Sequence, residues 1–409
     1  MLSYSAAAAV VLKQAEKLSS SRSASQSVPL IESLGCVLAE PVIADRDQPP
    51  FSRSTRDGFA CSAADLDPAR PLKIMGQLRS GQIWSGARLM SGEALEIMTG
   101  APVPEECDCV VMIEHVVVED GHVRPAQNRK WTSGENIVPR GAEAKAGSAL
   151  LTPGARMQPQ HIAVAAACGR HTLSVYQRPR VAILSTGDEL VPLDQSPLPY
   201  QIRNSNSYSL AAQVIRAGGE PVILPSVPDQ LPAIEASLAQ AQTCDLILLS
   251  GGVSMGKYDF VEQALANLGA EFFFTGALIQ PGKPVVFGRM PPAGEYRYFF
   301  GLPGNPVSTL ITFALFVAPI LGTLAGRSPE SCQPDFRQGR LDTGIKVKPG
   351  LTRFLPARST STIEGTQVKL QPWQGSGDVA AAAESNCFIV VPDNYERLAA
   401  NDTVTLLHL

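Results

Sequence analysis

The run DLILLSGGVSMGKYDF, residues 245–260, decides the fold of this chain. Its first six residues, 245–250, have an almost wholly apolar centre, which is typical of a parallel strand covered on both faces. Gly251 and Gly252 then let the backbone turn sharply and approach a ligand closely. Asp259 follows where the next helix should begin, and it can cap that helix or reach into the crevice beside it. Because open α/β sheets bind ligands beyond the carboxyl ends of their strands, this run predicts a binding site as well as a fold.

Strand and helix patterns alternate on both sides of this run, between about residues 179 and 329. Alternation at this spacing predicts a doubly wound, mostly parallel sheet. The predicted strands are 180–185, 221–224, 245–250, 284–288 and 296–300, and the predicted helices are 207–217, 230–242, 259–268 and 306–325.

The chain has 409 residues, which is too many for one compact core, so several domains are expected. Frequent glycines and short β segments predict that residues 46–136 form a β-rich insertion domain. Short alternating runs predict a small β-barrel or sandwich over residues 330–409, and we expect the barrel. We expect residues 1–45 and 137–178 to form one discontinuous α/β linker domain, beside the doubly wound domain of residues 179–329. The fold class is therefore α/β and multidomain.

Composition and cysteine usage narrow the class of protein. Hydrophobic residues make up 44% and charged residues 18%, and the net charge of −4 leaves no electrostatic footprint for nucleic acid. The eight cysteines form no CxxC pair and the five histidines are scattered, which argues against zinc and for a reducing, cytoplasmic location. Cys107 and Cys109 could bind a soft metal, but the apolar run after them favours buried structural thiols.

Two apolar segments resemble targeting or membrane signals. Residues 5–12 have no positive region before them and Lys13 directly after them, which favours an N-terminal amphipathic helix over a signal peptide. Residues 307–326 carry no charge, which meets the length criterion for a membrane span. Their hydroxyl side chains, Pro319 and their place after a strand and turn favour a buried central helix instead. No membrane partner is expected.

Three loops of the doubly wound region carry candidate chemistry. The loop at 185–189, STGDE, brings two hydroxyls, a glycine and two carboxylates to a strand end. This set suits a hydrated magnesium ion held by one or two carboxylates and by substrate phosphates. Residues 250–252, SGG, add backbone N–H groups for phosphate, and Asp259 adds a carboxylate. Residues 302–306, LPGNP, end a strand and open a helix, so Asn305 as the cap and the N–H groups there predict an anion site.

The turn QPGKP, residues 280–284, places Lys283 in a rigid backbone, where its point charge suits a phosphate or another oxyanion. Each junction alone has a structural explanation, since an aspartate at a strand end caps a helix more often than it binds a metal. Four junctions in one doubly wound unit favour a site. The chain has no P-loop, GxGxxG fingerprint or GxSxG elbow, so the expected ligand is a phosphorylated or nucleotide-bearing small molecule.

At these loops the chain resembles the molybdopterin molybdenumtransferase family, which includes bacterial MoeA. The matching motifs are STGDEL (185–190), SGGVSMG (250–256), PGKP (281–284) and GLPGNPVS (301–308). Further matches are DGFA (57–60), MTGAPVP (98–104), residues 135–141 and RNSNSY (203–208). The resemblance therefore runs from about residue 30 to 390. The joint occurrence of these motifs in this order is highly specific, although any one alone would be weak.

The resemblance implies an elongated homodimer with four domains per subunit and an active cleft formed between the subunits. The implied reaction inserts molybdate into the dithiolene of adenylated molybdopterin and releases AMP, with Mg²⁺ as the cofactor. A molybdopterin adenylyltransferase and molybdoenzyme acceptors are the protein partners that it suggests.

Loop chemistry and resemblance together predict the site residues. The predicted catalytic residues are Asp57, Thr99, Glu189, Asp259 and Lys283. The predicted magnesium ligands are Asp188, Glu189 and Asp259. The predicted substrate-binding residues are Ser185, Thr186, Gly187, Asp188, Asp229, Ser250, Gly251, Gly252, Ser254, Pro303, Gly304, Asn305, Pro306, Arg353 and Ser376.

Two departures from the family pattern bear on the cleft. Arg53 and Arg56 precede Asp57 where the family often has an amide and an apolar residue. These arginines either raise the positive potential beside that aspartate or point to solvent. Glu143 is one methylene longer than the aspartate of many members, which leaves its geometric role open.

Two other functions stay open on the sequence. One is an enzyme that adenylates molybdopterin, which the doubly wound region alone resembles; the surrounding domains argue against it. The other is a non-catalytic molybdopterin-binding scaffold, against which the intact Asp57, Glu189, Asp259 and Lys283 argue. The motifs do not distinguish molybdate from tungstate.

Overall fold

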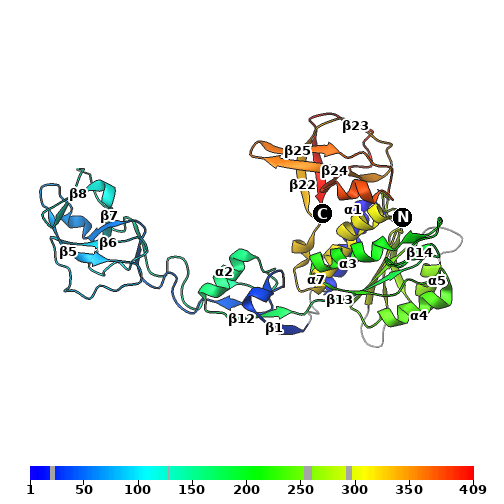
Figure 1. Cartoon of the computed structure of the whole chain (residues 1–409), viewed down its shortest axis with the longest axis horizontal. Coiled ribbons are helices and arrows are strands. Elements are labelled where there is room, and N and C mark those ends of the chain that lie inside the picture. The colour runs from blue at the N-terminus through cyan, green and yellow to red at the C-terminus, as the bar shows by residue number, and fades with distance from the viewer. Residues whose placement is uncertain (19–23, 128, 253–259, 292–296) are drawn as a thin grey trace. The chain divides into compact units, whose positions relative to one another are not determined.

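The computed structural model describes residues 1–18, 24–127, 129–252, 260–291 and 297–409. The chain divides into two compact units. The larger unit holds residues 1–39, 154–158 and 173–409, and the smaller unit holds residues 40–153 and 159–172. Figure 1 labels their helices and strands in chain order. The predicted division into four domains is finer than these two units and stays a prediction.

The larger unit is built on a six-stranded sheet in the order β16-β13-β17-β21-β20-β18. Its strands are parallel except for β20, which runs antiparallel to its neighbours β21 and β18. The predicted doubly wound, mostly parallel sheet is therefore confirmed. The sequence analysis does not predict β18, although its three phenylalanines are typical of a strand. The strands span Glu220–Ile223 (β16), Arg180–Ser185 (β13), Leu246–Ser250 (β17), Arg297–Leu302 (β21), Val286–Met290 (β20) and Glu271–Thr275 (β18).

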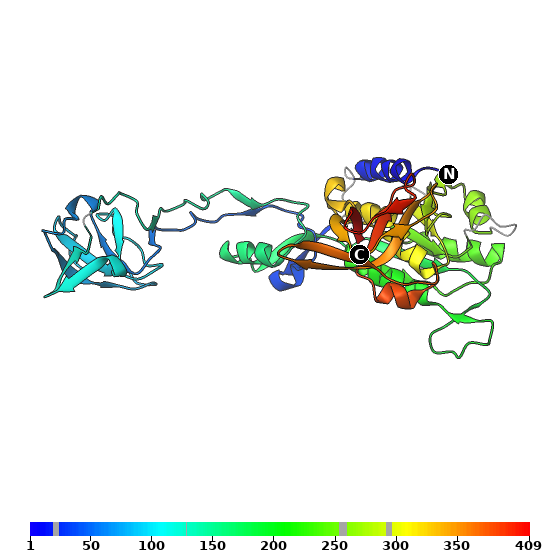
Figure 2. The same cartoon turned by 90° about the horizontal axis from the view of Figure 1, so that it is seen from above.

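Side chains of the central strands alternate between two hydrophobic cores, because successive residues of a strand point to opposite faces. On β13, Val181 and Ile183 join the core that contains α1, α3, α6 and α7. Ala182 and Leu184 join the core that contains α4 and α5. The sheet thus lies between two layers of helices (Figures 1 and 2). The helices span Tyr4–Leu18 (α1), Ser205–Ala217 (α3), Leu231–Ala241 (α4), Phe260–Asn267 (α5), Pro306–Thr312 (α6) and Ala318–Leu324 (α7).

The helix predicted over residues 306–325 is interrupted. A π-helical segment, Phe313–Val317, joins α6 to α7 directly before Pro319. Proline lacks an N–H and its ring clashes with the carbonyl four residues earlier, so the regular hydrogen-bond pattern cannot continue there. Pro306–Leu324 is long and apolar enough to cross a membrane, but 78% of its apolar window is buried inside the protein. This burial agrees with the predicted core helix.

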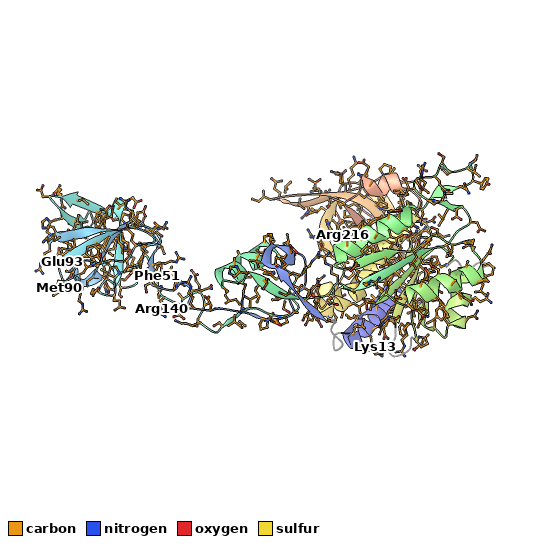
Figure 3. The ribbon with its side chains drawn as sticks, turned by 60° about the horizontal axis from the view of Figure 1, so that its bottom comes forward. Lys13, Phe51, Met90, Glu93, Arg140 and Arg216 are labelled. Atoms are coloured by element: carbon orange, nitrogen blue, oxygen red, sulfur yellow. The ribbon has the colours of Figure 1, made fainter. Side chains whose placement is uncertain are left out.

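The N-terminal segment forms the predicted amphipathic helix. α1 buries Ala7, Val11 and Ala15 in the larger core, while Lys13 is exposed on the helix surface (Figure 3). The chain then continues into β1 (Ser25–Pro29), which pairs with β12 (Thr172–Tyr176).

The C-terminal residues close into the predicted β-barrel. β24 pairs with both β25 and β26, so the five strands β24-β25-β22-β28-β26 form a closed ring. β19 (Ile279–Gln280) pairs in parallel with β24 and joins the barrel to the doubly wound region. The remaining elements span Phe336–Leu341 (β22), Ile345–Lys346 (β23), Thr352–Thr362 (β24), Gly365–Leu370 (β25), Val379–Ala383 (α8), Cys387–Val391 (β26), Arg397–Leu398 (β27) and Thr403–His408 (β28).

The smaller unit contains the predicted β-rich region, a six-stranded sheet in the order β7-β4-β6-β5-β9-β8. Two short antiparallel pairs, β3 with β10 and β2 with β11, hold together the chain segments that enter and leave it. Its elements span Val42–Ile43 (β2), Arg53–Ser54 (β3), Gly58–Cys61 (β4), Leu72–Leu78 (β5), Glu93–Ile97 (β6), Cys109–Met112 (β7), Val116–Glu119 (β8), His122–Pro125 (β9), Ile137–Val138 (β10), Ala149–Leu151 (β11) and Pro159–Ala167 (α2).

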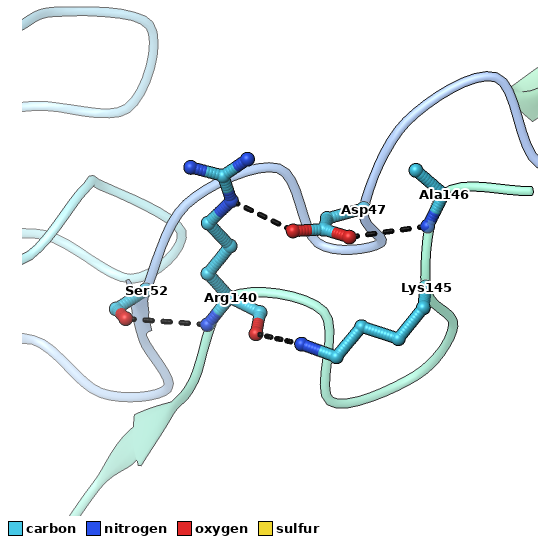
Figure 4. A network of polar contacts seen from close by, with 5 residues as sticks. All are labelled: Asp47, Ser52, Arg140, Lys145 and Ala146. Atoms are coloured by element: carbon cyan, nitrogen blue, oxygen red, sulfur yellow. Dashed lines mark hydrogen bonds and ion pairs between the residues drawn. The ribbon is translucent and has the colours of Figure 1, made fainter.

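A polar network also ties these entering and leaving segments together (Figure 4). The carboxylate of Asp47 accepts hydrogen bonds from Ala146 N at 3.1 Å and from Arg140 Nε at 2.8 Å. These contacts, with the backbone bond first, hold the pKa of Asp47 below its ordinary value. Arg140 N donates to Ser52 Oγ at 3.2 Å, and the carbonyl of Arg140 accepts from Lys145 Nζ at 3.4 Å.

The cysteines are the buried free thiols that the sequence predicts. All eight are buried and none forms a disulfide. Cys61 pairs with Cys109 across β4 and β7, and burial raises the pKa values of Cys107 and Cys109 to about 12. Protonated thiols are poor metal ligands. Within the described ranges, no group of three or more histidine, cysteine, aspartate or glutamate residues could hold a metal ion.

Candidate active site

The register of the large sheet brings the predicted loops to one edge. Ser185 pairs with Ser250 and Ser250 pairs with Leu302, so β13, β17 and β21 end side by side. β20 begins at the same edge, because it is antiparallel and its Val286 pairs with Gly301. The turn that carries Lys283 directly precedes β20. The loops after three parallel strands and the lysine turn therefore meet at the carboxyl edge, where open sheets bind ligands.

A cavity of about 400 Å³ opens at this edge. Eight of the predicted site residues line it, together with Leu190, residues 202–206 and two residues of the C-terminal segment. Hydroxyl and amide side chains line the cavity together with glycine backbone and a few apolar side chains, so it offers hydrogen-bonding groups to a ligand. The lining residues are Ser185, Thr186, Glu189, Leu190, Ile202, Arg203, Asn204, Ser205, Asn206, Ser250, Gly251, Gly304, Asn305, Pro306, Gly377 and Val379.

The glycine pair after β17 is required by the cavity. Gly251 and Gly252 have positive φ angles of 93° and 63°, in the region that side-chain-bearing residues rarely adopt. A Cβ on Gly251 would collide with the carbonyl oxygen of Thr186, and a Cβ on Gly252 would lie 2.8 Å from Thr186 Oγ1. The loop therefore packs its backbone directly against the loop after β13.

Asn204 organises the buried wall of the cavity. Its Oδ1 accepts a hydrogen bond from Ser207 N at 3.1 Å, which makes it the N-cap of α3. Its Nδ2 donates to Ser207 Oγ at 2.9 Å and to Ser226 Oγ at 2.8 Å. Ser207 Oγ also lies 2.8 Å from Ser185 Oγ. Ser185 is thus held within a hydroxyl–amide network.

Asn206 joins two of the loops and is absent from the predicted site, although its motif is among those that match the family. Its Nδ2 donates to Ser250 Oγ at 2.9 Å and to the carbonyl oxygen of Gly304 at 2.7 Å. Because a carbonyl oxygen can only accept, this contact identifies the amide nitrogen and leaves Oδ1 as an acceptor. Among the described residues, neither Asn206 Oδ1 nor Thr186 Oγ1 has a hydrogen-bond partner, although both atoms are buried. Unsatisfied buried polar atoms are rare outside functional sites.

The acidic loop after β13 presents two exposed carboxylates. Asp188 Oδ1 accepts a hydrogen bond from Asp229 N at 3.3 Å. Glu189 lines the cavity, and its carboxylate lies over Gly187, where an added Cβ would be 2.6 Å from Glu189 Oε2. Magnesium needs only one or two protein carboxylates when substrate oxygens and waters complete its shell, so this donor set fits the predicted ion. Asp259 and Ser254 lie outside the described residues.

The structure corrects the prediction that the side chain of Asn305 caps α6, while the predicted anion site there stays a prediction. Asn305 occupies the N-cap position, but its side chain accepts no hydrogen bond from the helix. Its Nδ2 instead donates to Ser376 Oγ at 2.8 Å. Pro306 has no N–H, and Val307 N already donates to the carbonyl of Ser376 at 3.0 Å. Ser376, in the loop before α8, therefore takes the side-chain amide of Asn305 and the N–H of Val307 at this helix end.

Lys283 and Arg353 are not among the residues that line the cavity. Gly282 has φ +107°, and an added Cβ would lie 2.6 Å from Thr312 Cγ2, so the turn packs tightly on α6 while Lys283 stays exposed. Arg353 is opposite Gln280 in the β19–β24 pair. Its Nε and Nη2 donate to the carbonyl of Lys348 at 3.1 and 2.6 Å.

The smaller unit brings Asp57 and Thr99 together. Asp57 Oδ1 accepts hydrogen bonds from Thr99 N at 2.6 Å and from Thr99 Oγ1 at 2.8 Å. These two bonds, the backbone one first, lower the pKa of Asp57, and both residues are exposed. Gly58 next to them tolerates no side chain, because a Cβ would collide with the carbonyl of Val111 across the sheet.

These features define a multidomain α/β protein with a polar small-molecule cavity at the carboxyl edge of its sheet. Family models match three stretches of the chain: the MoeA N-terminal region (domain I and II) at residues 2–169, a probable molybdopterin binding domain at 182–323, and the MoeA C-terminal region (domain IV) at 338–409.

Curated relatives match the chain over nearly its whole length. The molybdopterin molybdenumtransferase of Synechococcus elongatus is 34% identical over 100% of both chains. That of Bacillus subtilis is 33% identical over 93% of this chain and 89% of its own. The chain therefore belongs to the molybdopterin molybdenumtransferase family.

Solved structures of MoeA proteins are also similar to this chain over nearly its whole length. A crystal structure of the molybdopterin biosynthesis MoeA protein from Pyrococcus horikoshii OT3 has a TM-score of 0.80, with 25% identity and complete coverage of both chains. A second structure of a MoeA protein from Pyrococcus has a TM-score of 0.72, with 28% identity, and covers 97% of this chain and 98% of its own.

Proposed function

We propose that this chain is a molybdopterin molybdenumtransferase, which inserts molybdate into the dithiolene of adenylated molybdopterin and releases AMP. The observation that carries the proposal is the cavity of about 400 Å³ at the carboxyl edge of the sheet, where the STGDE, SGG and LPGNP loops meet. The buried acceptor of Asn206 and the buried hydroxyl of Thr186 support it, since both atoms need a partner that the described protein does not supply.

The cavity and the lysine turn are assigned to different parts of the substrates. We assign the phosphate and pyrophosphate of the substrate to the backbone N–H groups around Gly251 and Gly252 and to the ammonium of Lys283. Molybdate is a tetrahedral dianion, so hydroxyl, amide and cationic groups suit it better than carboxylates do. Ser376, Arg353 and Lys283 supply such groups beside the cavity.

Glu189 and Asp188 would hold Mg²⁺, with Asp259 as a further proposed ligand. Both described carboxylates are exposed at the mouth of the loop, so they are free to meet a hydrated ion together with substrate oxygens. The bound ion would polarise the pyrophosphate link and favour its cleavage.

We further propose a homodimer, in which Asp57 and Thr99 of one subunit contribute to the cleft of the other. Asp57 and Thr99 belong to the smaller unit and the cavity belongs to the larger one, so each subunit carries both contributions. Sedimentation should then give about twice the chain mass of 43.5 kDa. A cytoplasmic location and an upstream adenylyltransferase and downstream molybdoenzymes as partners belong to this proposal.

The test of the function is a reconstituted reaction. The purified chain is incubated with adenylated molybdopterin, molybdate and Mg²⁺, and AMP is measured. Molybdate-dependent AMP release supports the proposal. ATP consumption with unmodified molybdopterin would instead identify an adenylyltransferase, and binding without either reaction would identify a scaffold.

A further inference from the structure

Four arginines from four separate segments gather on the larger unit, away from the cavity residues. They are Arg156, Arg178, Arg216 and Arg327, here called the arginine cluster. Arg216 ends α3 (Figure 3), Arg327 follows α7, and Arg178 follows β12. Nothing in the proposed reaction uses them.

Backbone and side-chain contacts bring the four segments together. Arg156 forms an antiparallel bridge with Val37, and its Nη2 donates to the carbonyl oxygen of Arg216 at 2.9 Å. Arg178 Nη2 lies 3.8 Å from the thiol of Cys36, the neighbour of Val37.

The segment before Arg327 packs on the same place. A Cβ on Gly326 would collide with the ring of Tyr176, and a Cβ on Gly154 would lie 3.4 Å from the carbonyl of Gly326. Arg327 itself donates to the carbonyl of Ser331. Arg178 and Arg327 thus contact a thiol and a carbonyl oxygen, which are both neutral.

Arg178, Arg216 and Arg327 bring three positive charges to the surroundings of Arg156. Across the part of the chain that the structure describes, no ion pair joins a carboxylate to Arg178, Arg216 or Arg327. Burial lowers the pKa of Arg156, and the positive charges of the other three arginines lower it further. Like charges held close together are costly unless an anion offsets them.

A structural role explains part of this arrangement but not all of it. Arg156 bonds the carbonyl of Arg216 in the last turn of α3, where a cation is favourable, and Arg327 bonds the carbonyl of Ser331. Arg178 and Arg216, however, are exposed and add charge to the same place without a carbonyl of their own. Guanidinium groups are well suited to bind phosphate oxygens in pairs.

We propose that the arginine cluster is a binding site for a multivalent phosphate-type oxyanion, separate from the catalytic cavity. The half-buried guanidiniums of Arg156 and Arg327 form its base, and the exposed Arg178 and Arg216 close over the anion. This inference does not depend on the proposed activity, because it rests on the cluster alone.

The probe is inorganic pyrophosphate at constant ionic strength. Phenylglyoxal labelling of the full-length protein, read out by peptide mass spectrometry, follows each arginine separately. Pyrophosphate should slow the labelling of Arg178 and Arg216 several-fold, while the exposed barrel residues Arg340 and Arg397 label at an unchanged rate. Because labelling is resolved by residue, binding at the cavity beside Arg203 is distinguished from binding at the cluster.

A matched pair of variants completes the test by calorimetry. Arg178→Gln/Arg216→Gln should lose one class of pyrophosphate sites, with affinity there reduced more than about tenfold by loss of two charge-assisted contacts. Arg340→Gln/Arg397→Gln removes the same charge from the same unit. This variant should keep both classes of pyrophosphate site, the one at the arginine cluster and the one at the cavity. Equal labelling of Arg178 and Arg216 with and without pyrophosphate would overturn the proposal. So would protection by an acidic peptide but not by pyrophosphate, which would identify a protein-docking surface instead.

Discussion

Arg53 Nη2 lies 3.0 Å from Glu143 Oε1, so two residues that depart from the family pattern are ion-paired with each other. The pairing follows from β3 and β10, which place Arg53 opposite Val138 and bring the chain after it alongside. The two alternatives are that these arginines raise the positive potential beside Asp57 or that they point to solvent. Arg53 is instead paired with a carboxylate, while Arg56 is exposed.

The ion pair should couple the two residues only weakly in stability. Its side chains are 35% and 55% exposed, and exposed pairs contribute about 0.2–1 kcal/mol. A double-mutant cycle with Arg53→Gln and Glu143→Gln, measured by urea unfolding, should return a coupling in that range. The coupling should shrink as salt is raised, because the pair is screened. A salt-independent coupling of several kcal/mol would contradict the exposed geometry.

Gly251→Ala should damage the site more than conformational strain alone explains. The substitution puts a Cβ against the Thr186 carbonyl and also forces an alanine to φ +93°. Gly350→Ala is the matched control, because Gly350 has φ +104° and nothing within 4 Å of an added Cβ. Each variant should lose about 1–3 kcal/mol from backbone strain. Only Gly251→Ala should also lose AMP release. Equal activity of the two variants would show that the close contact of Gly251 with the Thr186 carbonyl is not needed for the reaction.

Glu189→Gln should abolish magnesium-dependent AMP release and leave the fold intact. The side chain is exposed, so stability should change by no more than about 0.5 kcal/mol. Glu396→Gln, an exposed carboxylate of the barrel segment, is the control for charge. Thermal unfolding and a magnesium titration of AMP release check both points. Full turnover by Glu189→Gln at saturating substrate would end its assignment as a metal ligand.

Lys283→Ala should weaken binding of adenylated molybdopterin by about 1.5–3 kcal/mol, the range for a hydrogen bond to a charged group. Lys283→Arg should restore little of this affinity, because a planar fork does not replace a compact ammonium. Lys369→Ala, at another exposed lysine of the same unit, controls for the loss of one positive charge. Affinities are compared in one buffer at fixed salt, and no difference between wild type and Lys283→Ala would take this lysine out of the site.

Asp57 should titrate below the ordinary aspartate range, and Thr99 should be the cause. Because its folded pKa lies below its unfolded pKa, the interaction favours the folded state above the unfolded pKa. That contribution is lost as pH falls through the folded pKa. Thr99→Val removes the hydroxyl donor but keeps the Thr99 N–H donor, so the pKa of Asp57 should rise only part of the way back. Carboxyl-carbon NMR titration measures this shift, and an unchanged pKa in Thr99→Val would contradict the observed hydrogen bond.

Much of the candidate site follows from local sequence patterns. The strands β13, β17 and β21 and the loops after them are predicted because apolar runs ending in glycine, hydroxyl and acidic residues have a local physical meaning. Ser185, Thr186, Glu189, Ser250, Gly251, Gly304, Asn305 and Pro306 do meet at one cavity. Asn206 is missed, since its amide acts between Ser250 and Gly304, which are distant in sequence.

The amino-acid sequence by itself determined the class of fold, the β-rich character of the C-terminal region and the loops after the parallel strands, because hydrophobic period and turn chemistry are local properties of the chain. Only the tertiary structure decided how those loops are completed. The reversed direction of β20 brings the lysine turn to the binding edge, and Ser376 takes the side chain of Asn305 that would otherwise cap α6. Arg53 and Glu143 are 90 residues apart in the chain, and the tertiary structure alone brings them into contact. Such contacts depend on strand direction and on packing between distant segments, and no local pattern specifies either.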